Sequence, residues 1–157
     1  MATLGPLPIV GAPPLGFRFG VLFFAGGVIP NPLDILFQKV SGIGATVETM
    51  TVEEGGQNFY TQLLPKKIQH ENLVLERGLV VGSPLVIEFN AAMSLFKFKP
   101  SNVLVSLLDN TRIPLASWLF MKAYPVKWSV SDLDATTNAV VIEHMELTYQ
   151  RMQTIRL

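Results

Sequence analysis

The chain has 157 residues, enough for one domain with a single core that needs neither metal nor disulfide support. Twelve basic and twelve acidic residues cancel, which argues against broad electrostatic binding of nucleic acid, and the absence of cysteine excludes disulfides, thiolate nucleophiles and sulfur-ligated metals. Hydrophobic residues make up 49% of the chain and charged residues only 15%, against about 25% in an ordinary soluble domain. We therefore expect surplus apolar surface that is covered by copies of the chain or by partners.

The N-terminal stretch is apolar and rich in Pro and Gly, which blocks helix formation and central-strand pairing. We expect residues 1–16 to form an extended arm that either packs on a neighbouring subunit or is a frayed terminus. The apolar run from Phe19 to Ile29 is shorter than the roughly 20 residues of a membrane-spanning helix and is interrupted by Gly26 and Gly27. It also lacks the flanks of a signal peptide, so we expect no membrane insertion by this chain.

Extended segments dominate the first half of the chain. Aromatic and β-branched residues predict a strand over residues 17–24. Residues 36–50 are expected to be mostly extended, and the alternation over residues 46–53 leaves both faces mixed, which is typical of a strand exposed to partners. The following EEGGQN, Glu53 to Asn58, indicates a loop too long for a tight hairpin turn. A second extended run is predicted from Ile68 to Arg77.

A helix is predicted after Gly82. Ser83 can cap free backbone amides, and Pro84 suits the first helical position. Apolar residues then recur at helical spacing and predict about three turns lying on a sheet; they are Leu85, Phe89, Ala92, Met93 and Phe96.

The rest of the chain returns to strands, predicted over residues 102–109, 118–128 and 139–149. One helix among six or seven strands predicts a mainly β protein: a small antiparallel β-barrel or sandwich with one flanking α-helix and an extended hairpin loop. We see no linker that would split the chain, so residues 17–157 are expected to form a single domain.

The polar residues form no reactive constellation. Ser83 lacks the Gly-x-Ser-x-Gly of a nucleophile elbow and is better used as a helix cap. His70 and His144 each lie beside a glutamate in a predicted strand, where adjacent side chains point to opposite faces, so neither pair chelates one ion. We therefore predict a protein that is not an enzyme, with no catalytic residue, no metal site and no cofactor.

Three further motifs are better explained by structure than by a binding or catalytic function. Gly42 and Gly44 lack the third glycine, the lysine and the helix of a phosphate-binding loop, so a bend in a strand is favoured. Alternation over residues 96–99, FKFK, places two aromatic side chains inward and two lysines outward, facing solvent or a channel of an assembly. Trp118 and Trp128 are predicted to be core and interface anchors.

Six short pieces, taken in order and spacing, resemble the inner tail-tube proteins of contractile phage tails and phage-like contractile injection systems. They are FQKVSG (37–42), EGG (54–56), LP (64–65), NLVLERG (72–78), AYPVKW (123–128) and VIEHMEL (141–147). The resemblance covers residues 17–149 and extends, more distantly, to the ring-forming haemolysin-coregulated protein of type VI secretion.

This resemblance implies a structural subunit of hexameric rings that stack into a hollow tube inside a contractile sheath. The implied partners are further copies of the chain, a sheath protein, baseplate or hub proteins and tube-terminating proteins. Cargo or nucleic acid is implied only as a passenger in the lumen. The implied location is a phage tail or phage-like particle that is assembled in the bacterial cytoplasm.

The resemblance also implies site residues. It places an inter-ring contact loop at Glu53, Glu54, Gly55, Gly56, Gln57, Asn58, Phe59, Tyr60, Leu64 and Pro65. It places a packing corner at Trp118, Pro125 and Trp128. The apolar arm is longer, and residues 33–36 less polar, than the usual family pattern. These departures leave open whether the subunit forms the main shaft or a specialised ring, such as a tube initiator near the baseplate.

Two other classes of function stay open on sequence grounds. A monomeric β-barrel carrier of an apolar ligand would fit the aromatic content, and light scattering would find it monomeric. An enzyme that uses His144 with a carboxylate would lose its turnover in His144→Ala.

Overall fold

The computed structural model describes residues 18–24, 37–53, 55–56 and 59–156. The predicted arm over residues 1–16 lies outside these ranges, as do Glu54, Gln57 and Asn58 of the predicted contact loop. Within the described ranges the chain forms nine strands and one helix. In chain order they are β1 (Phe19–Phe24), β2 (Lys39–Ser41), β3 (Ala45–Val52), β4 (Gln62–His70), β5 (Leu73–Gly78), α1 (Pro84–Leu95), β6 (Ser101–Leu108), β7 (Pro114–Val130), β8 (Ile142–Thr148) and β9 (Arg151–Arg156).

All strand pairs are antiparallel, which confirms the predicted mainly β fold with one helix. The main sheet has the order β1-β6-β7-β8-β5-β2, and β9 pairs with the first part of β7. Strands β3 and β4 form a separate pair. The outermost strands of the main sheet, β1 and β2, are not paired with each other. The described strands therefore do not close into a barrel, which corrects one of the two predicted architectures.

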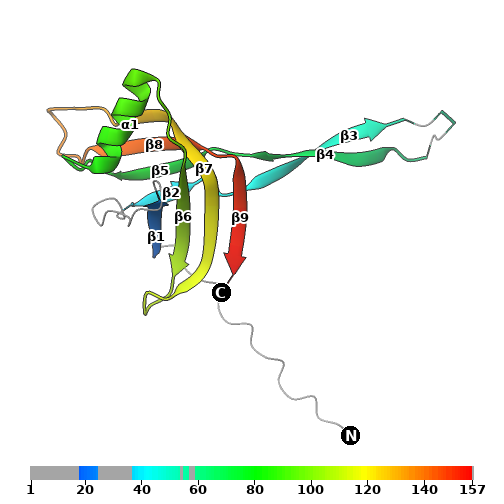
Figure 1. Ribbon diagram of the computed structural model, residues 1–157, viewed down its shortest axis with the longest axis horizontal. Helices are drawn as coiled ribbons and strands as arrows, with labels where there is room; N and C mark the ends of the chain where they lie inside the picture. Colours follow the sequence, from blue (N-terminus) through cyan, green and yellow to red (C-terminus); the bar gives the residue numbers. More distant parts are fainter. Residues whose placement is uncertain (1–17, 25–36, 54, 57–58, 157) are drawn as a thin grey trace, which may run out of the picture.

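The long strand β7 joins two halves of the main sheet that run in different directions (Figure 1). Its first part pairs with β6 and β9, and its second part, from Tyr124, pairs with β8. The chain bends between these parts: Lys122 has a φ of 52°, its backbone N–H donates to Asn102 Oδ1 at 3.2 Å, and the register shifts between Pro125 and Lys127. Such bulges bend a strand and sharpen its twist.

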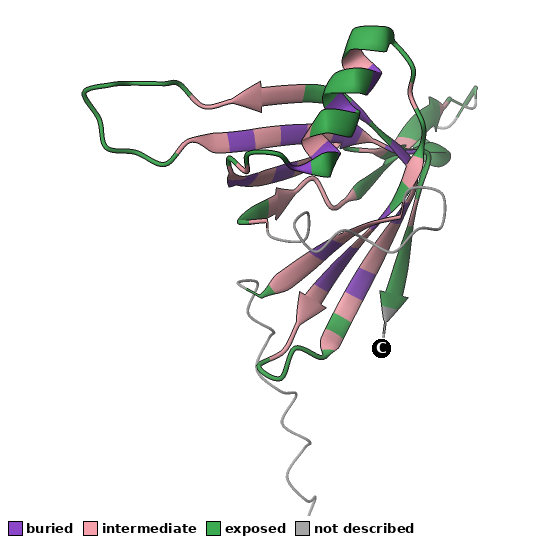
Figure 2. Cartoon of the chain, turned by 60° about the vertical axis from the view of Figure 1, so that its left-hand side comes forward, coloured by how far each residue is buried: buried purple, intermediate pink, exposed green. Residues whose placement is uncertain are grey.

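The core lies between the two sheet halves, with the first turns of α1 packed against it. Alternate residues of β5 and β8 are fully buried, as the period of two requires when only one face meets the core (Figure 2). The cluster comprises Val21, Leu73, Leu75, Leu85, Phe89, Val103, Val105, Phe120, Ala123, Met145, Leu147 and Tyr149.

Helix α1 begins where the sequence predicts. The Ser83 hydroxyl accepts a hydrogen bond from the Val86 backbone N–H at 3.5 Å, and Pro84 opens the first turn. Leu85, Phe89 and Ala92 are buried. Phe96 departs from the predicted stripe: it is the C-cap residue, with a φ of 51°, and its side chain is 83% exposed.

Two strand predictions are wrong. The single run predicted from Ile68 to Arg77 is two strands of different sheets, β4 and β5. The break falls at Asn72, whose side-chain amide donates to Glu146 Oε1 at 2.7 Å and so ties the start of β5 to β8. Strand β9 was not predicted, and β7 begins at Pro114 rather than Trp118.

Among the described residues, no helix is long and apolar enough to cross a membrane.

Candidate functional site

The most distinctive feature outside the core is a hairpin of β3 and β4 that projects from the body of the molecule (Figure 1). In the described part of the chain these two strands pair only with each other. Every residue of β4 except the last is exposed. An isolated two-stranded hairpin is marginally stable in water, so this arrangement points to a covering partner.

One face of the hairpin is apolar. Val47 lies directly opposite Ile68, and Leu63 lies opposite Thr51 two steps further along the same face. Ile68 is 62% exposed, and the other two apolar side chains are similarly open. Non-bonded contacts across the pair stabilise the hairpin itself, but most of this apolar area faces solvent.

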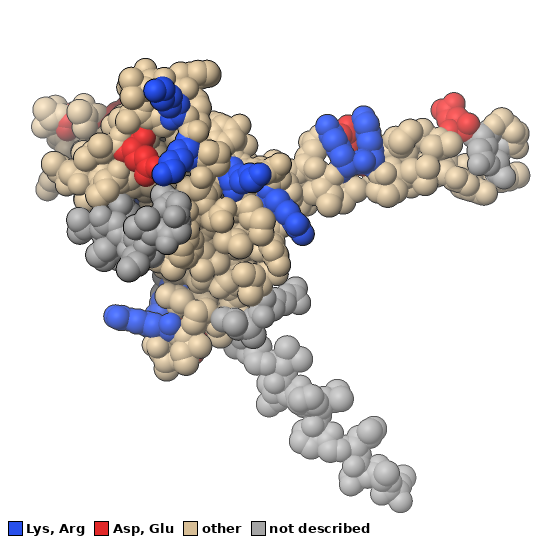
Figure 3. Space-filling view, in the orientation of Figure 1, with Lys and Arg blue, Asp and Glu red and all other residues tan. Residues whose placement is uncertain are grey.

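The opposite face has a charged cluster at a β-bulge. The register shifts between Glu48 and Thr49, so Lys66 and Lys67 both reach the carboxylate of Glu48, each with an Nζ–O distance of 3.5 Å. Gln69 Nε2 also donates to Glu48 at 3.1 Å. Two lysines against one glutamate give this cluster a local net positive charge, and Figure 3 shows basic and acidic groups together on the hairpin. Glu53 lies nearer the tip and adds a negative charge there.

The predicted contact loop is the tip of this hairpin together with part of β4. Glu53, Gly55 and Gly56 lie in the described part of the tip, and Gly56 has a φ of +100°, a conformation that favours glycine. Phe59 is 97% exposed and Tyr60 is also exposed. Leu64 and Pro65 belong to strand β4 rather than to a loop. The role of this loop in inter-ring contact stays a prediction.

The three residues of the predicted packing corner lie along β7, on both sides of its bend. Trp118 packs against the core from the half that contains β6 and β9. Pro125 is buried just past the bend. Trp128 packs against the core in the other half, and its indole Nε1–H donates to Glu143 Oε1 at 2.7 Å.

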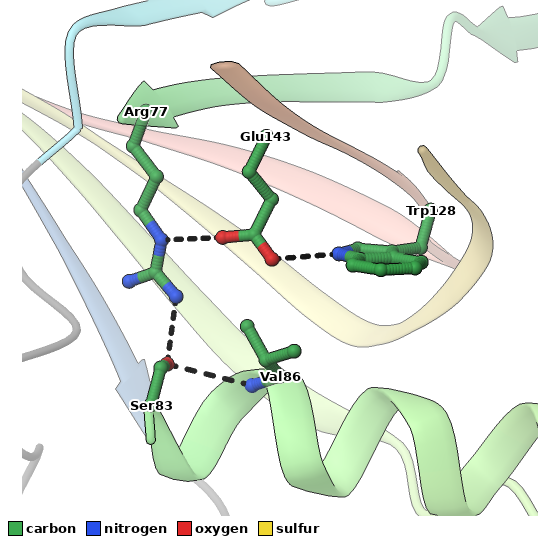
Figure 4. Close-up of polar contacts among 5 residues, drawn as sticks. All are labelled: Arg77, Ser83, Val86, Trp128 and Glu143. Atoms are coloured by element: carbon green, nitrogen blue, oxygen red, sulfur yellow. Dashed lines mark hydrogen bonds and ion pairs between the residues drawn. The ribbon is translucent and has the colours of Figure 1, made fainter. Parts of the chain in front are cut away.

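Glu143 belongs to a buried polar network that sequence reasoning missed (Figure 4). Arg77 Nε donates to Glu143 Oε2 at 3.0 Å, and both side chains are fully buried. Arg77 Nη2 donates to the Ser83 hydroxyl at 2.7 Å, which in turn caps α1. The guanidinium also lies 5.2 Å from the centre of the Phe37 ring. The network thus ties β5, β7, β8 and the start of α1 together.

Each of the two histidines contacts a neighbouring side chain. His144 Nδ1 is 3.4 Å from Glu76 Oε1, which Lys39 Nζ also contacts at 3.2 Å. His70 packs on Tyr149, with ring centroids 5.3 Å apart. Burial, together with the negative charge of Glu71, raises the pKa of Tyr149, so its phenol stays neutral near pH 7. No group of three or more potential metal ligands occurs in the described ranges.

The surface between α1 and the sheet bears on the carrier hypothesis. A groove of about 230 Å³ runs there, lined mainly by apolar side chains such as Leu85, Phe89 and Leu147. Typical small-molecule sites measure about 300–1,000 Å³. The groove therefore gives the carrier hypothesis little support.

The fold has close counterparts among solved structures of contractile injection systems. A chain of the anti-feeding prophage baseplate is 37% identical, with a TM-score of 0.85 over 92% of this chain and 97% of that chain. A chain of the PVC sheath-tube complex, an extracellular contractile injection system in its extended state, is 22% identical, with a TM-score of 0.78 over 94% and 95%. Hcp1 from Flavobacterium johnsoniae shares the fold at 13% identity, with a TM-score of 0.51 over 88% and 94%.

The architecture is therefore that of tube proteins of contractile tails and injection systems. Residues 15–153 match the model of the T4-like virus tail tube protein gp19 family, and the chain belongs to that family. The match spans nearly the whole sequence and confirms the family predicted from the six short pieces. A comparison with curated proteins gives no match. Members of this family are structural, and the chain is a tail tube protein rather than an enzyme.

Proposed function

We propose that this tail tube protein assembles as hexameric rings that stack into the hollow inner tube of a phage tail or phage-like injection particle. The observation that supports stacking is the projecting hairpin, whose apolar face has no cover in the described part of the chain. A hairpin at one end of each subunit that docks on another copy makes a head-to-tail contact. Such contacts repeat to give rings or filaments. The sixfold ring size comes from the family resemblance.

The sheet margins support lateral closure of the ring. In the described residues, β1 pairs only with β6, β9 pairs only with β7, and β2 pairs only with β5. Each margin presents backbone N–H and C=O groups that a neighbouring chain can pair with. Extension of the sheet across the subunit boundary would satisfy these groups and close a ring.

We infer further partners from the assemblies in which the similar chains were solved. Their structures are a baseplate, a sheath-tube complex and a sheath/tube terminator. We expect this subunit to contact a sheath protein, baseplate or hub proteins and tube-terminating proteins, within a particle that is assembled in the bacterial cytoplasm. Cargo or nucleic acid would pass through the lumen without a dedicated site.

Removal of the hairpin tip tests the stacking role. Deletion of residues 54–60 should leave a folded subunit, because no described residue of this stretch belongs to the core. The variant should form no stacked tubes in negative-stain microscopy, whereas circular dichroism should still report a β protein. Normal tubes from this variant would contradict the proposal.

A matched pair of point variants sharpens this test. Ile68→Ser removes an apolar side chain from the hairpin, and Ile87→Ser removes one of nearly equal exposure, 62% against 63%, from α1. We expect only the hairpin variant to reduce tube formation. Equal effects of the two substitutions would show that the loss of tube formation does not depend on where the apolar side chain is removed.

A baseplate-proximal ring is a second candidate within the same function. The chain shares 37% identity with a chain of the anti-feeding prophage baseplate but only 22% with a chain of the PVC sheath-tube complex. A gold-labelled subunit in assembled particles separates the candidates: label confined to the baseplate end supports the specialised ring, and label along the tube supports the main shaft.

A further inference from the structure

Exposed aromatic side chains occur at two places in the described part of the chain. Phe59 and Tyr60 lie at the tip of the hairpin, and Phe59 is 97% exposed. Phe96 and Tyr124 lie at the end of α1 and on β7, and both are exposed. A phenylalanine or tyrosine covers about 150–250 Å² when it is buried, and such residues are enriched where proteins meet. Both places are therefore candidates for contact with another chain.

The aromatic residues beside α1 form a continuous row. The Phe98 ring lies between the other two, with its centroid 5.3 Å from that of Phe96 and 5.7 Å from that of Tyr124. Phe96 has a φ of 51°, a conformation that glycine commonly supplies at a helix end. Its side chain is 83% exposed, so the ring gains little from packing within the subunit. A strained backbone that holds an aromatic ring in water points to a contact outside the subunit.

The groove between α1 and the sheet adjoins this row. Leu95, Lys97 and Lys99, which alternate along the chain with Phe96 and Phe98, line the groove. We call it the α1 groove. Its volume is about 230 Å³. An apolar cavity of about 150 Å³ is enough to take up benzene, so the α1 groove can hold one phenyl ring although it is small for an ordinary ligand.

The charges at the α1 groove and at the hairpin tip are opposite. Lys97 and Lys99 line the groove together with one acidic residue, Glu88, and all three are exposed. At the tip, residues 50–65 contain two glutamates and no lysine or arginine. Glu53, which is exposed, is one of the two. The tip is thus aromatic and negative, whereas the α1 groove and its rim are aromatic and positive.

The tip cannot meet the groove of its own chain. Figure 1 shows the hairpin pointing away from the body, with α1 on the opposite side of the body. A contact between the two surfaces therefore joins two copies. Since the surfaces differ, such a contact does not saturate in a dimer and continues from copy to copy.

We propose that the α1 groove of one copy is the docking site for the hairpin tip of a second copy. The ring of Phe59 fills the groove, Tyr60 packs against the aromatic row, and Glu53 lies close to Lys97. This inference rests on the proposed tube function, in which the contact joins subunits head to tail. It assigns a partner surface to the hairpin tip and a role to the exposed ring of Phe96.

Disulfide trapping tests which surface the tip meets. The chain has no cysteine, so only introduced residues can react. A tagged Tyr60→Cys subunit, which keeps Phe59, is mixed with an untagged Leu95→Cys subunit under assembly conditions and mild oxidation. In the control, Leu133→Cys replaces Leu95→Cys; Leu133 is 80% exposed against 67% for Leu95. We expect a yield of mixed disulfide at least about tenfold above the control, because docking raises the effective concentration of the two thiols.

A charge swap provides an independent measurement. Glu53→Lys and Lys97→Glu each place like charges across the proposed contact, and self-association measured by sedimentation should weaken about two- to fivefold in each. The double variant restores opposite charges and should return to within about twofold of the unmodified chain. Neither side chain is buried, so thermal unfolding of the subunit should not move.

The outcomes separate this inference from the function on which it rests. Tubes that form while the Leu95 pair reacts no better than the Leu133 pair would overturn the α1 groove as the docking site and leave the tube function standing. A double variant that associates no better than the single variants would also overturn it. A subunit that stays monomeric by light scattering at all accessible concentrations would overturn the tube function and the inference together.

Discussion

At the scale of single residues, the most consequential feature is the buried ion pair of Arg77 and Glu143. Two charges taken out of water repay their desolvation only when hydrogen bonds satisfy the groups around them. Here Trp128 donates to the second oxygen of Glu143, and Ser83 accepts from Arg77. The pair therefore fixes the relative placement of β5, β7, β8 and α1, the elements that support the body of the subunit.

Removal of the carboxylate should be strongly destabilising. We expect Glu143→Ala to lower the free energy of unfolding by about 3–5 kcal/mol, because the Arg77 guanidinium is left buried without its counter-charge. Urea denaturation measures the loss. The control is Glu76→Ala, which removes a carboxylate that is partly exposed and contacts Lys39 and His144, and it should cost at most about 1 kcal/mol. Similar losses in the two variants would show that burial does not govern the pair.

At the scale of elements, the link from β2 to β3 sets the course on which the chain leaves the body for the hairpin. Gly42 has a φ of +82°, and a Cβ built there would overlap the carbonyl oxygen of Asn72. Gly44, two residues later, has open space around it and no positive φ. The sequence interpretation of these glycines as a bend, rather than a phosphate loop, agrees with this geometry.

The two glycines give a matched prediction. Gly42→Ala should destabilise the subunit by about 1–3 kcal/mol, because alanine must adopt a strained φ and displace the backbone at Asn72. Gly44→Ala should be neutral or slightly stabilising. Thermal melts of both variants test this, and a loss at Gly44 as large as that at Gly42 would refute the conformational argument.

Helices and strands were predictable from the sequence where neighbouring residues determine their position. The Ser83-Pro84 cap located the start of α1, and the alternation after Thr46 located the exposed strand β3. The break at Asn72 was not predictable, because it depends on Glu146, a residue 74 positions away. The bend of β7 likewise depends on its partners β6 and β8. Arg77 and Glu143 did carry a usable signal, since each shares its strand face with two buried apolar residues.

The site was predictable only in part for the same reason. The glycines and the exposed apolar residues of the hairpin tip are visible in the sequence, and the family resemblance gave them a role. The apolar face formed by Val47 and Ile68 requires the cross-strand register.

At the scale of the whole molecule, net neutrality and low charge decide which force dominates assembly. The chain has twelve basic and twelve acidic residues, so copies neither attract nor repel strongly at long range. In the proposed tube, exposed apolar side chains of the hairpin such as Val47, Leu63 and Ile68 supply the burial between copies. Hydrophobic burial is insensitive to screening, but exposed charge pairs are weakened by salt.

Tube formation should therefore survive high salt. At 1 M NaCl the screening length falls to about 3 Å, so contacts between exposed charges of neighbouring copies weaken while apolar burial persists. We expect the fraction of pelletable assembly to fall less than about fivefold between 0.1 and 1 M NaCl. Sodium sulfate at equal ionic strength should increase it, because that salt strengthens apolar association. Complete dissolution of assemblies by 1 M NaCl would show that charge, rather than apolar surface, holds the copies together.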